Sequence, residues 1–202
     1  IVSRTGFTNE LGWEIYIRPE NDAKIIGDLI LSEGKKMGML LTASPGFRGR
    51  RIEAGLLSAG RDFTKDRNPF SVGLGKFIDF NKGEFIGRDF LINANKECLT
   101  WGMRVENSFA KVDSDILLNN KKIGIVTSST WSPYQQCGVS IVHMNDKKFG
   151  PETIVDVLCD DGQLNKGEIC KLPMYDFKGD IPRGIKQDIP EGPVPWKGIC
   201  KN

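Results

Sequence analysis

The apolar positions near the start of the chain follow two different periods. Residues 13–18 alternate apolar and polar side chains, which predicts a half-buried strand that ends before Pro19. Asn21 or Asp22 can then cap a helix, because the apolar residues that follow are spaced three and four apart as far as Gly34. The pattern predicts a strand followed by an α-helix.

A second helix is predicted after a loop at residues 44–46. Its apolar face comprises Phe47, Ile52, Leu56 and Leu57. We expect this helix to end near Gly60. Residues 61–83 contain turn-forming side chains without a sustained period, and we expect irregular structure there.

Short apolar runs separated by turn pairs begin near residue 98. The pair Asn119-Asn120 lies between two such runs and Asp161-Gly162 between two more, and both pairs are typical of hairpin turns. With a further run at residues 138–144, four or five strands predict a small antiparallel barrel or sandwich. The proline-rich end of the chain predicts an extended arm over the surface.

Length and composition narrow the class of protein. The 202 residues suffice for one large domain or two small ones, and the hydrophobic fraction of 39% is ordinary for a globular protein. The net charge of +2 gives no reason to expect nucleic acid or a membrane surface as a partner. No apolar run approaches the length of a membrane span.

The cysteines favour a reducing compartment. None of the five belongs to a C-x-x-C pair, and the chain has one histidine, so we expect no metal site and a cytoplasmic location. The chain begins at Ile1, without Met, in sequence that already resembles a strand. We therefore expect the natural protein to begin earlier and this chain to be its C-terminal part.

Several stretches match one known family in the same order and spacing. RTGFTNELGWEI at residues 4–15 is followed by RRIEAGLLSAGRD at 50–62. NPFSVGLGKFIDFNKGEFIGRDFL at 68–91, IGIVTSSTWSPYQQCGVSIVHM at 123–144 and CKLPMYD at 170–176 complete the series. Together they resemble the glycine-cleavage T-protein (aminomethyltransferase) family over most of the chain. One departure is Asn9, which stands where the family usually has Gly.

The resemblance implies an α+β fold in three parts. Residues 1–95 would form the C-terminal part of a folate-binding α/β region, 98–176 a small antiparallel β-barrel, and 177–202 an extended Pro-rich tail. The family's catalytic Asp would lie upstream of Ile1. Catalytic residues therefore stay unassigned in this chain, and we expect these residues alone to be inactive.

The resemblance also implies tetrahydrofolate-dependent transfer of an aminomethyl or methyl group. The donor would be a small one-carbon compound or a lipoyl carrier protein, and a homodimer is one of the assemblies that the family allows. Two alternatives stay open. One is a methyltransferase similar to dimethylsulfoniopropionate demethylase, and the other is a folate-binding module without transfer chemistry.

Glu10 is the first candidate for binding tetrahydrofolate. A reduced pterin presents a ring N–H and an amino group side by side, and a carboxylate offers two acceptor oxygens at a matching separation. The alternative is that Glu10 caps a turn or points into water, as most glutamates do.

Arg48 and Trp131 are the other candidates. Arg48, with Arg50 and Arg51, lies at the start of a predicted helix, and we expect at least one of them to bind the carboxylates of the folate tail. Arg48 is the first candidate because it lies nearest the position at which the family has an arginine. The alternatives are a solvated basic face or a structural ion pair with Glu53 or Asp62.

Trp131 offers a flat face at the edge of the predicted barrel. It could stack on the pterin or on the aminobenzoyl ring, and a core position is the alternative. The lone His143, on a predicted strand, is interpreted as structural.

Overall fold

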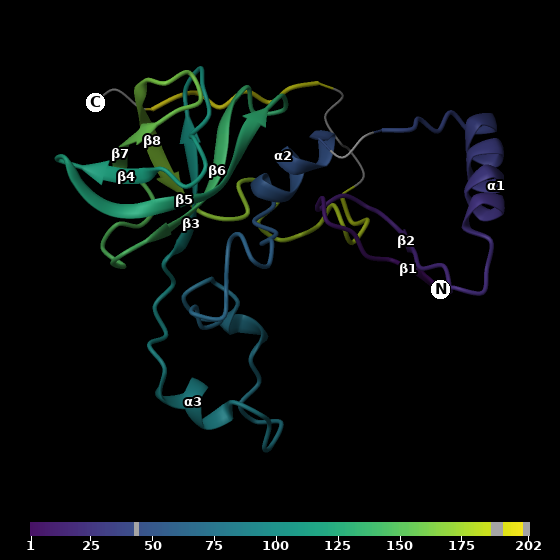
Figure 1. Ribbon diagram of the computed structural model, residues 1–202, viewed down its shortest axis with the longest axis horizontal. Coiled ribbons are helices and arrows are strands. Elements are labelled where there is room, and N and C mark those ends of the chain that lie inside the picture. The colour runs from purple at the N-terminus through teal and green to yellow at the C-terminus, as the bar shows by residue number, and fades with distance from the viewer. Residues whose placement is uncertain (43–44, 187–191, 200–202) are drawn as a thin grey trace.

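The computed structural model describes residues 1–42, 45–186 and 192–199. A barrel forms one end of an elongated molecule, and the first helix lies at the other end (Figure 1). The elements are, in order, β1 (Val2–Ser3), β2 (Glu14–Ile15), α1 (Ala23–Lys36), α2 (Pro45–Glu53), η1 (Gly75–Phe77), α3 (Arg88–Asn93), β3 (Thr100–Val105), β4 (Asp115–Leu118), β5 (Lys121–Ser132), β6 (Cys137–Met144), β7 (Ile154–Leu158) and β8 (Leu164–Cys170).

Six antiparallel strands close into a barrel in the order β3-β6-β5-β4-β7-β8. The predicted hairpin turns are confirmed: Asn119 and Asn120 have φ values of 50° and 59°, and Gly162 has a φ of 78°. The sequence predicted four or five strands, whereas the barrel has six. Aliphatic and sulfur-containing side chains fill its interior, including Met103, Val126, Val142, Val157 and Ile169. The α+β class predicted from the resemblance is confirmed.

The predicted strand near the start of the chain is shorter and more exposed than expected. Only Glu14 and Ile15 are in β2, which pairs with β1 through Val2 and Ser3. Trp13 is 64% exposed, so the expectation of a half-buried strand is wrong. The reason is that β1 and β2 form a two-stranded sheet that contributes no residue to the buried core of the described chain.

The first predicted helix is present with the predicted cap. Asp22 accepts hydrogen bonds from the backbone N–H groups of Lys24 (2.8 Å) and Ile25 (3.1 Å). The helix continues to Lys36, two residues beyond the expected end. No residue of α1 is buried, so its apolar stripe has no partner among the described residues.

The second helix differs from its prediction at both ends. Pro45 and Gly46 belong to α2 rather than to a loop, and Ser44 lies outside the described residues. The helix ends at Glu53 rather than near Gly60, because Gly55 takes a left-handed conformation (φ 68°) that ends the helical hydrogen bonding. Ile52 is fully buried against the outer face of β6.

The remaining connections place other segments against the barrel. Residues 61–83 contain one short 3-10 helix and are otherwise irregular, as predicted. Val194 and Trp196 donate backbone hydrogen bonds to the carbonyls of Tyr134 and Gln135, while residues 187–191 and 200–202 of the predicted tail lie outside the described part. Within the described chain no helix has the length and apolar character to cross a membrane, and no cluster of side chains forms a metal site.

Candidate functional site

An ion-pair network connects the turn before β2 to α2. Arg50 and Glu53 lie three residues apart, on one face of the helix, and Arg50 Nη1 donates to Glu53 Oε2 at 2.8 Å. Arg50 Nη2 donates to Glu10 Oε1, which reaches the helix from the turn. One guanidinium therefore bridges two carboxylates, and Glu53, at 1% exposure, is the more buried of them.

Two tyrosines flank this guanidinium. The Arg50 Cζ atom lies 4.9 Å from the ring centre of Tyr134 and 4.6 Å from that of Tyr175. Tyr134 follows β5 and Tyr175 follows β8, so segments from both sides of the barrel meet at α2. Burial lowers the pKa of Arg50, but its hydrogen bond to Glu10 and the nearby negative charges outweigh this effect and raise the pKa overall.

The turn leaves two buried polar atoms without hydrogen bonds. The Oε2 atom of Glu10 and the Nδ2 atom of Asn9 are both buried and have no hydrogen-bond partner among the described residues. The Glu10 side chain as a whole is 27% exposed. An ionised carboxylate with a free, occluded oxygen is an acceptor suited to a ligand that brings its own donor.

Two buried carboxylates fasten α2 and its loop to the outer face of β5. The Ser132 hydroxyl donates to Glu53. Asp62, which is fully buried, accepts from Arg51 (2.7 Å), from the Thr127 hydroxyl (2.7 Å) and from the Ser128 hydroxyl (2.6 Å). Buried charges with this many partners are structural anchors. The alternative that arginines of the cluster form structural ion pairs is thus confirmed for two of them. Arg50 pairs with Glu53, and Arg51 pairs with Asp62.

Arg48 lies on the other side of α2 from Arg50, since two helical residues separated by two positions point about 200° apart. It lines a cavity of about 290 Å³ together with Arg51, Ser58, Arg61, Val112, Thr127, Ser128 and Ser129. Its guanidinium has no hydrogen bond or ion pair within the described ranges. The pocket combines three arginines with hydroxyl groups, a chemistry suited to anions.

Trp131 is 38% exposed and lies near the end of β5. Alternation along the strand puts it on the face opposite Ser128 and Ser132, whose hydroxyls contact Asp62 and Glu53. The structure therefore does not bring the three predicted ligand-binding residues into one site. Glu10 meets Arg50, while Arg48 and Trp131 lie on other surfaces.

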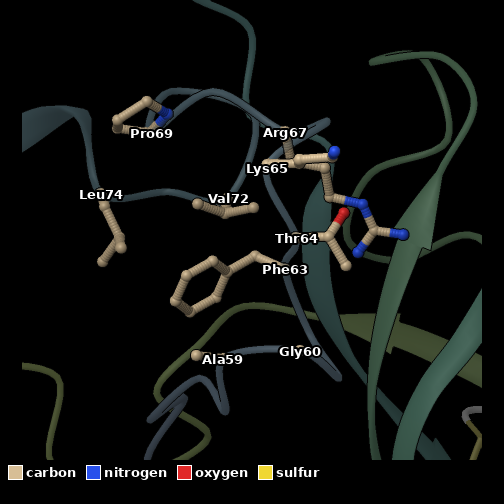
Figure 2. A pocket seen from close by; sticks show the side chains of 9 residues that line it. All are labelled: Ala59, Gly60, Phe63, Thr64, Lys65, Arg67, Pro69, Val72 and Leu74. Atoms are coloured by element: carbon tan, nitrogen blue, oxygen red, sulfur yellow. The ribbon is translucent and has the colours of Figure 1, made fainter.

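Two larger cavities lie elsewhere on the described chain. One, of about 540 Å³, is bounded by Asn9, by the end of α2 and by barrel residues; Lys76, Phe77, Thr100, Asp176 and Phe177 also line it. The other, of about 520 Å³, has the apolar side chains of Phe63, Val72 and Leu74 on one side, and Arg67 turns toward the barrel strands (Figure 2). None of the residues lining the second cavity is acidic, whereas the first is lined by Asp176 and by Asn9, the neighbour of Glu10 in sequence.

Sequence reasoning missed three residues of this site. Arg50 was part of the named cluster, but its role as the partner of Glu10 was not predicted. Tyr134 and Tyr175 were not singled out, although both lie in stretches that carry the family resemblance. Nothing in their spacing indicates that they would meet around one guanidinium, since that depends on the closure of the barrel.

Comparisons with known proteins agree on one family. A model of the GCVT N-terminal domain matches residues 1–82. An aminomethyltransferase of Caldanaerobacter subterraneus subsp. tengcongensis is 35% identical over 152 residues, which are 73% of this chain and 40% of that protein. An aminomethyltransferase of Aquifex aeolicus is 31% identical over 177 residues, which are 86% of this chain and 47% of that protein.

The fold is similar to that of a solved structure. The glycine cleavage system aminomethyltransferase T from Bartonella henselae superimposes with a TM-score of 0.75 at 22% identity. The match covers 87% of this chain and 49% of the Bartonella henselae chain. At this identity the likeness shows the fold. The chain spans less than half the length of each of these three relatives.

Proposed function

Because the chain belongs to the glycine-cleavage T-protein family, we propose that it takes part in the transfer of a one-carbon unit to tetrahydrofolate. The relatives named aminomethyltransferase support a transferase, and the shared fold supports a common architecture. The donor would be an aminomethyl group on a lipoyl carrier protein or a small one-carbon compound. The chain spans less than half of each of these relatives, so this activity is a proposal.

The observation that carries the proposal is the state of the Glu10 carboxylate. Arg50 donates to Oε1, and Oε2 is buried without a hydrogen-bond partner in the described part of the chain. The ring N–H and exocyclic amino group of a reduced pterin would supply the missing donors, and an oxygen that already accepts one bond can accept a second. Charge-assisted hydrogen bonds of this kind are strong where water is excluded.

Arg48 would bind the carboxylates of the folate tail in the arginine-lined pocket. Its guanidinium is exposed and has no acidic partner in the part of the chain that the structure describes, so it is available to an anion. Because Arg48 and Arg50 lie on opposite sides of α2, only an extended ligand could contact both Glu10 and Arg48. Trp131 would stack on a ring that approaches the end of the barrel rather than the Glu10 turn.

A second candidate, folate binding without transfer chemistry, is favoured by one observation. Glu53 and Asp62, the fully buried carboxylates near the site, each accept several hydrogen bonds and are committed to structure. Proton transfer needs a group that is free to change its protonation state, so this part of the site is better suited to binding.

The test is calorimetric titration of tetrahydrofolate into the chain. We expect saturable binding of one ligand. Aminomethylated lipoyl carrier protein, sarcosine, dimethylsulfoniopropionate and an aromatic methyl ether are then offered as donors to the folate-bound protein. Absence of tetrahydrofolate binding would overturn the proposal. Binding without transfer from any donor would favour the second candidate.

A further inference from the structure

The backbone at Asn9 explains part of its identity. Its φ of 59° lies in the left-handed region, which glycine occupies freely and asparagine more readily than other residues with a side chain. The family usually has Gly at this position. Glycine meets the backbone requirement at a lower cost, so conformation alone does not account for an amide here.

The amide of Asn9 has a hydrogen-bond donor to spare. Its Nδ2 atom is buried and makes no hydrogen bond with the described residues. Burial of the ring raises the pKa of Tyr175, and the Asn9 side chain opposes this rise to a smaller extent. An amide nitrogen carries two hydrogens, and an amide hydrogen left unmatched in a buried position is costly.

Asn9 and Glu10 converge on the same group of side chains. The Glu10 carboxylate accepts from Arg50, whose Cζ atom lies 4.6 Å from the centre of the Tyr175 ring. The hydroxyl of that tyrosine donates to the carbonyl of Thr8, the residue before Asn9, at 3.3 Å. Two consecutive residues of the turn thus carry a donor and an acceptor that are both unmatched among the described residues. Asn9 also lines the cavity of about 540 Å³, so there is room beside it for a ring.

A ligand that satisfies both atoms must carry an acceptor beside a donor on one edge. The 2-amino-4-oxo edge of a pterin has this order, since its 4-oxo oxygen lies next to the ring N3–H and the 2-amino group. We propose that Asn9 determines specificity by donating to the 4-oxo oxygen while Glu10 accepts from the two donors. This inference rests on the proposed function, because it takes Glu10 as the pterin-binding residue.

The inference predicts discrimination against 4-amino pterins. A 4-amino group would direct its hydrogens at the Asn9 donor, which then stays unmatched in a buried site. Loss of one such bond corresponds to roughly tenfold in affinity. The 4-amino ring also lacks the N3–H, so it loses a hydrogen bond to Glu10 as well. The contribution of Asn9 is therefore measured as the change that a substitution at Asn9 causes in the ratio of the affinities for the 4-oxo and 4-amino ligands.

The experiment titrates tetrahydrofolate and its 4-amino-4-deoxy analogue into the wild-type chain, Asn9→Gly and Asn9→Asp. Asn9→Gly keeps the left-handed backbone and removes the amide, and we expect the preference for the 4-oxo ligand to fall about tenfold. Asn9→Asp replaces the donor by an acceptor, and we expect the affinity for the 4-amino analogue to rise relative to that for tetrahydrofolate. The matched control is Asn119→Gly, at an exposed turn with a φ of 50°, which should leave the ratio unchanged.

Each outcome decides a different claim. If tetrahydrofolate binds to the wild type and Asn9→Gly keeps the full preference, the inference about Asn9 is wrong and the proposed function stands. If Asn9→Asp shifts the ratio no more than Asn119→Gly, the inference is also overturned. If tetrahydrofolate does not bind to the wild type, the proposed function fails and the inference fails with it.

Discussion

Arg50 donates to Glu10 across forty positions of sequence, and the same guanidinium donates to Glu53 within its own helix. The bond fixes the turn that carries Glu10 against α2, and α2 is itself fastened to the barrel through Glu53 and Ser132. The candidate pterin-binding carboxylate is therefore positioned by the barrel, although none of its own neighbours in sequence belongs to it.

Glu10→Gln should weaken tetrahydrofolate binding far more than Arg48→Ala does. Gln replaces one acceptor by a donor that would oppose the donors of the pterin, at a cost of roughly 1.5–3 kcal/mol per bond. Arg48 would meet the carboxylates of an exposed tail, where water and salt screen the contact, and its loss should cost about 1 kcal/mol or less. Titrations at low and moderate salt measure both. Equal losses in the two variants would show that Glu10 is not the pterin-binding residue.

Arg50→Met should destabilise the protein by about 3 kcal/mol, because it leaves the buried Glu53 carboxylate without its cation. Chemical denaturation followed by circular dichroism measures the free energy of unfolding. The matched control is Arg18→Met, which removes an exposed arginine whose pair with Glu20 is 3.8 Å long. That change should cost less than about 1 kcal/mol. If the two variants were equally stable, the Arg50 network would have no structural role.

Asp62→Asn should be destabilising by about 3–5 kcal/mol, since it removes the charge that Arg51 pairs with in a fully buried position. The control is Asp113→Asn, at a residue that is 73% exposed and lies 3.4 Å from Arg61. We expect the control to lose less than about 1 kcal/mol. The prediction is contradicted if Asp62→Asn unfolds at the same denaturant concentration as the control.

His143 should make the protein less stable as the pH falls from 7 to 5. Burial, with the nearby charge of Arg67, lowers the pKa of His143 to about 4. An unfolded histidine has a pKa near 6.5, so below that pH the unfolded chain binds a proton that the folded chain does not. Stability is therefore lost between the two values, and by pH 5 the loss should be about 1–2 kcal/mol.

The measurement for His143 is urea denaturation at pH 7, 6 and 5 in the wild type and in His143→Gln. Because the chain has one histidine, the variant isolates its contribution, and the difference between the two proteins should change with pH in this window. Parallel curves for the two proteins would mean that His143 keeps an ordinary pKa in the fold. In the wild type the hydroxyl of Thr100 lies 2.9 Å from Nδ1 of His143.

The sequence alone determined the features that depend on neighbours along the chain. Asp22 caps α1 and Asn119-Asn120 forms a hairpin turn because these side chains act on backbone groups only a few positions away. The alternating runs after residue 98 predicted a small antiparallel barrel or sandwich, and the five quoted stretches identified the family.

Tertiary structure decided what depends on distant segments. The length of β2 and the exposure of Trp13 follow from what packs on that strand, and an alternating pattern cannot report this. Likewise, the sequence singled out Glu10 and an arginine cluster. Whether Arg50 or Arg48 pairs with Glu10 depends on which side of α2 faces the turn. That orientation is set by the burial of Ile52 and the contacts of Glu53 and Asp62 with the barrel, because buried apolar surface and buried charge must be satisfied together.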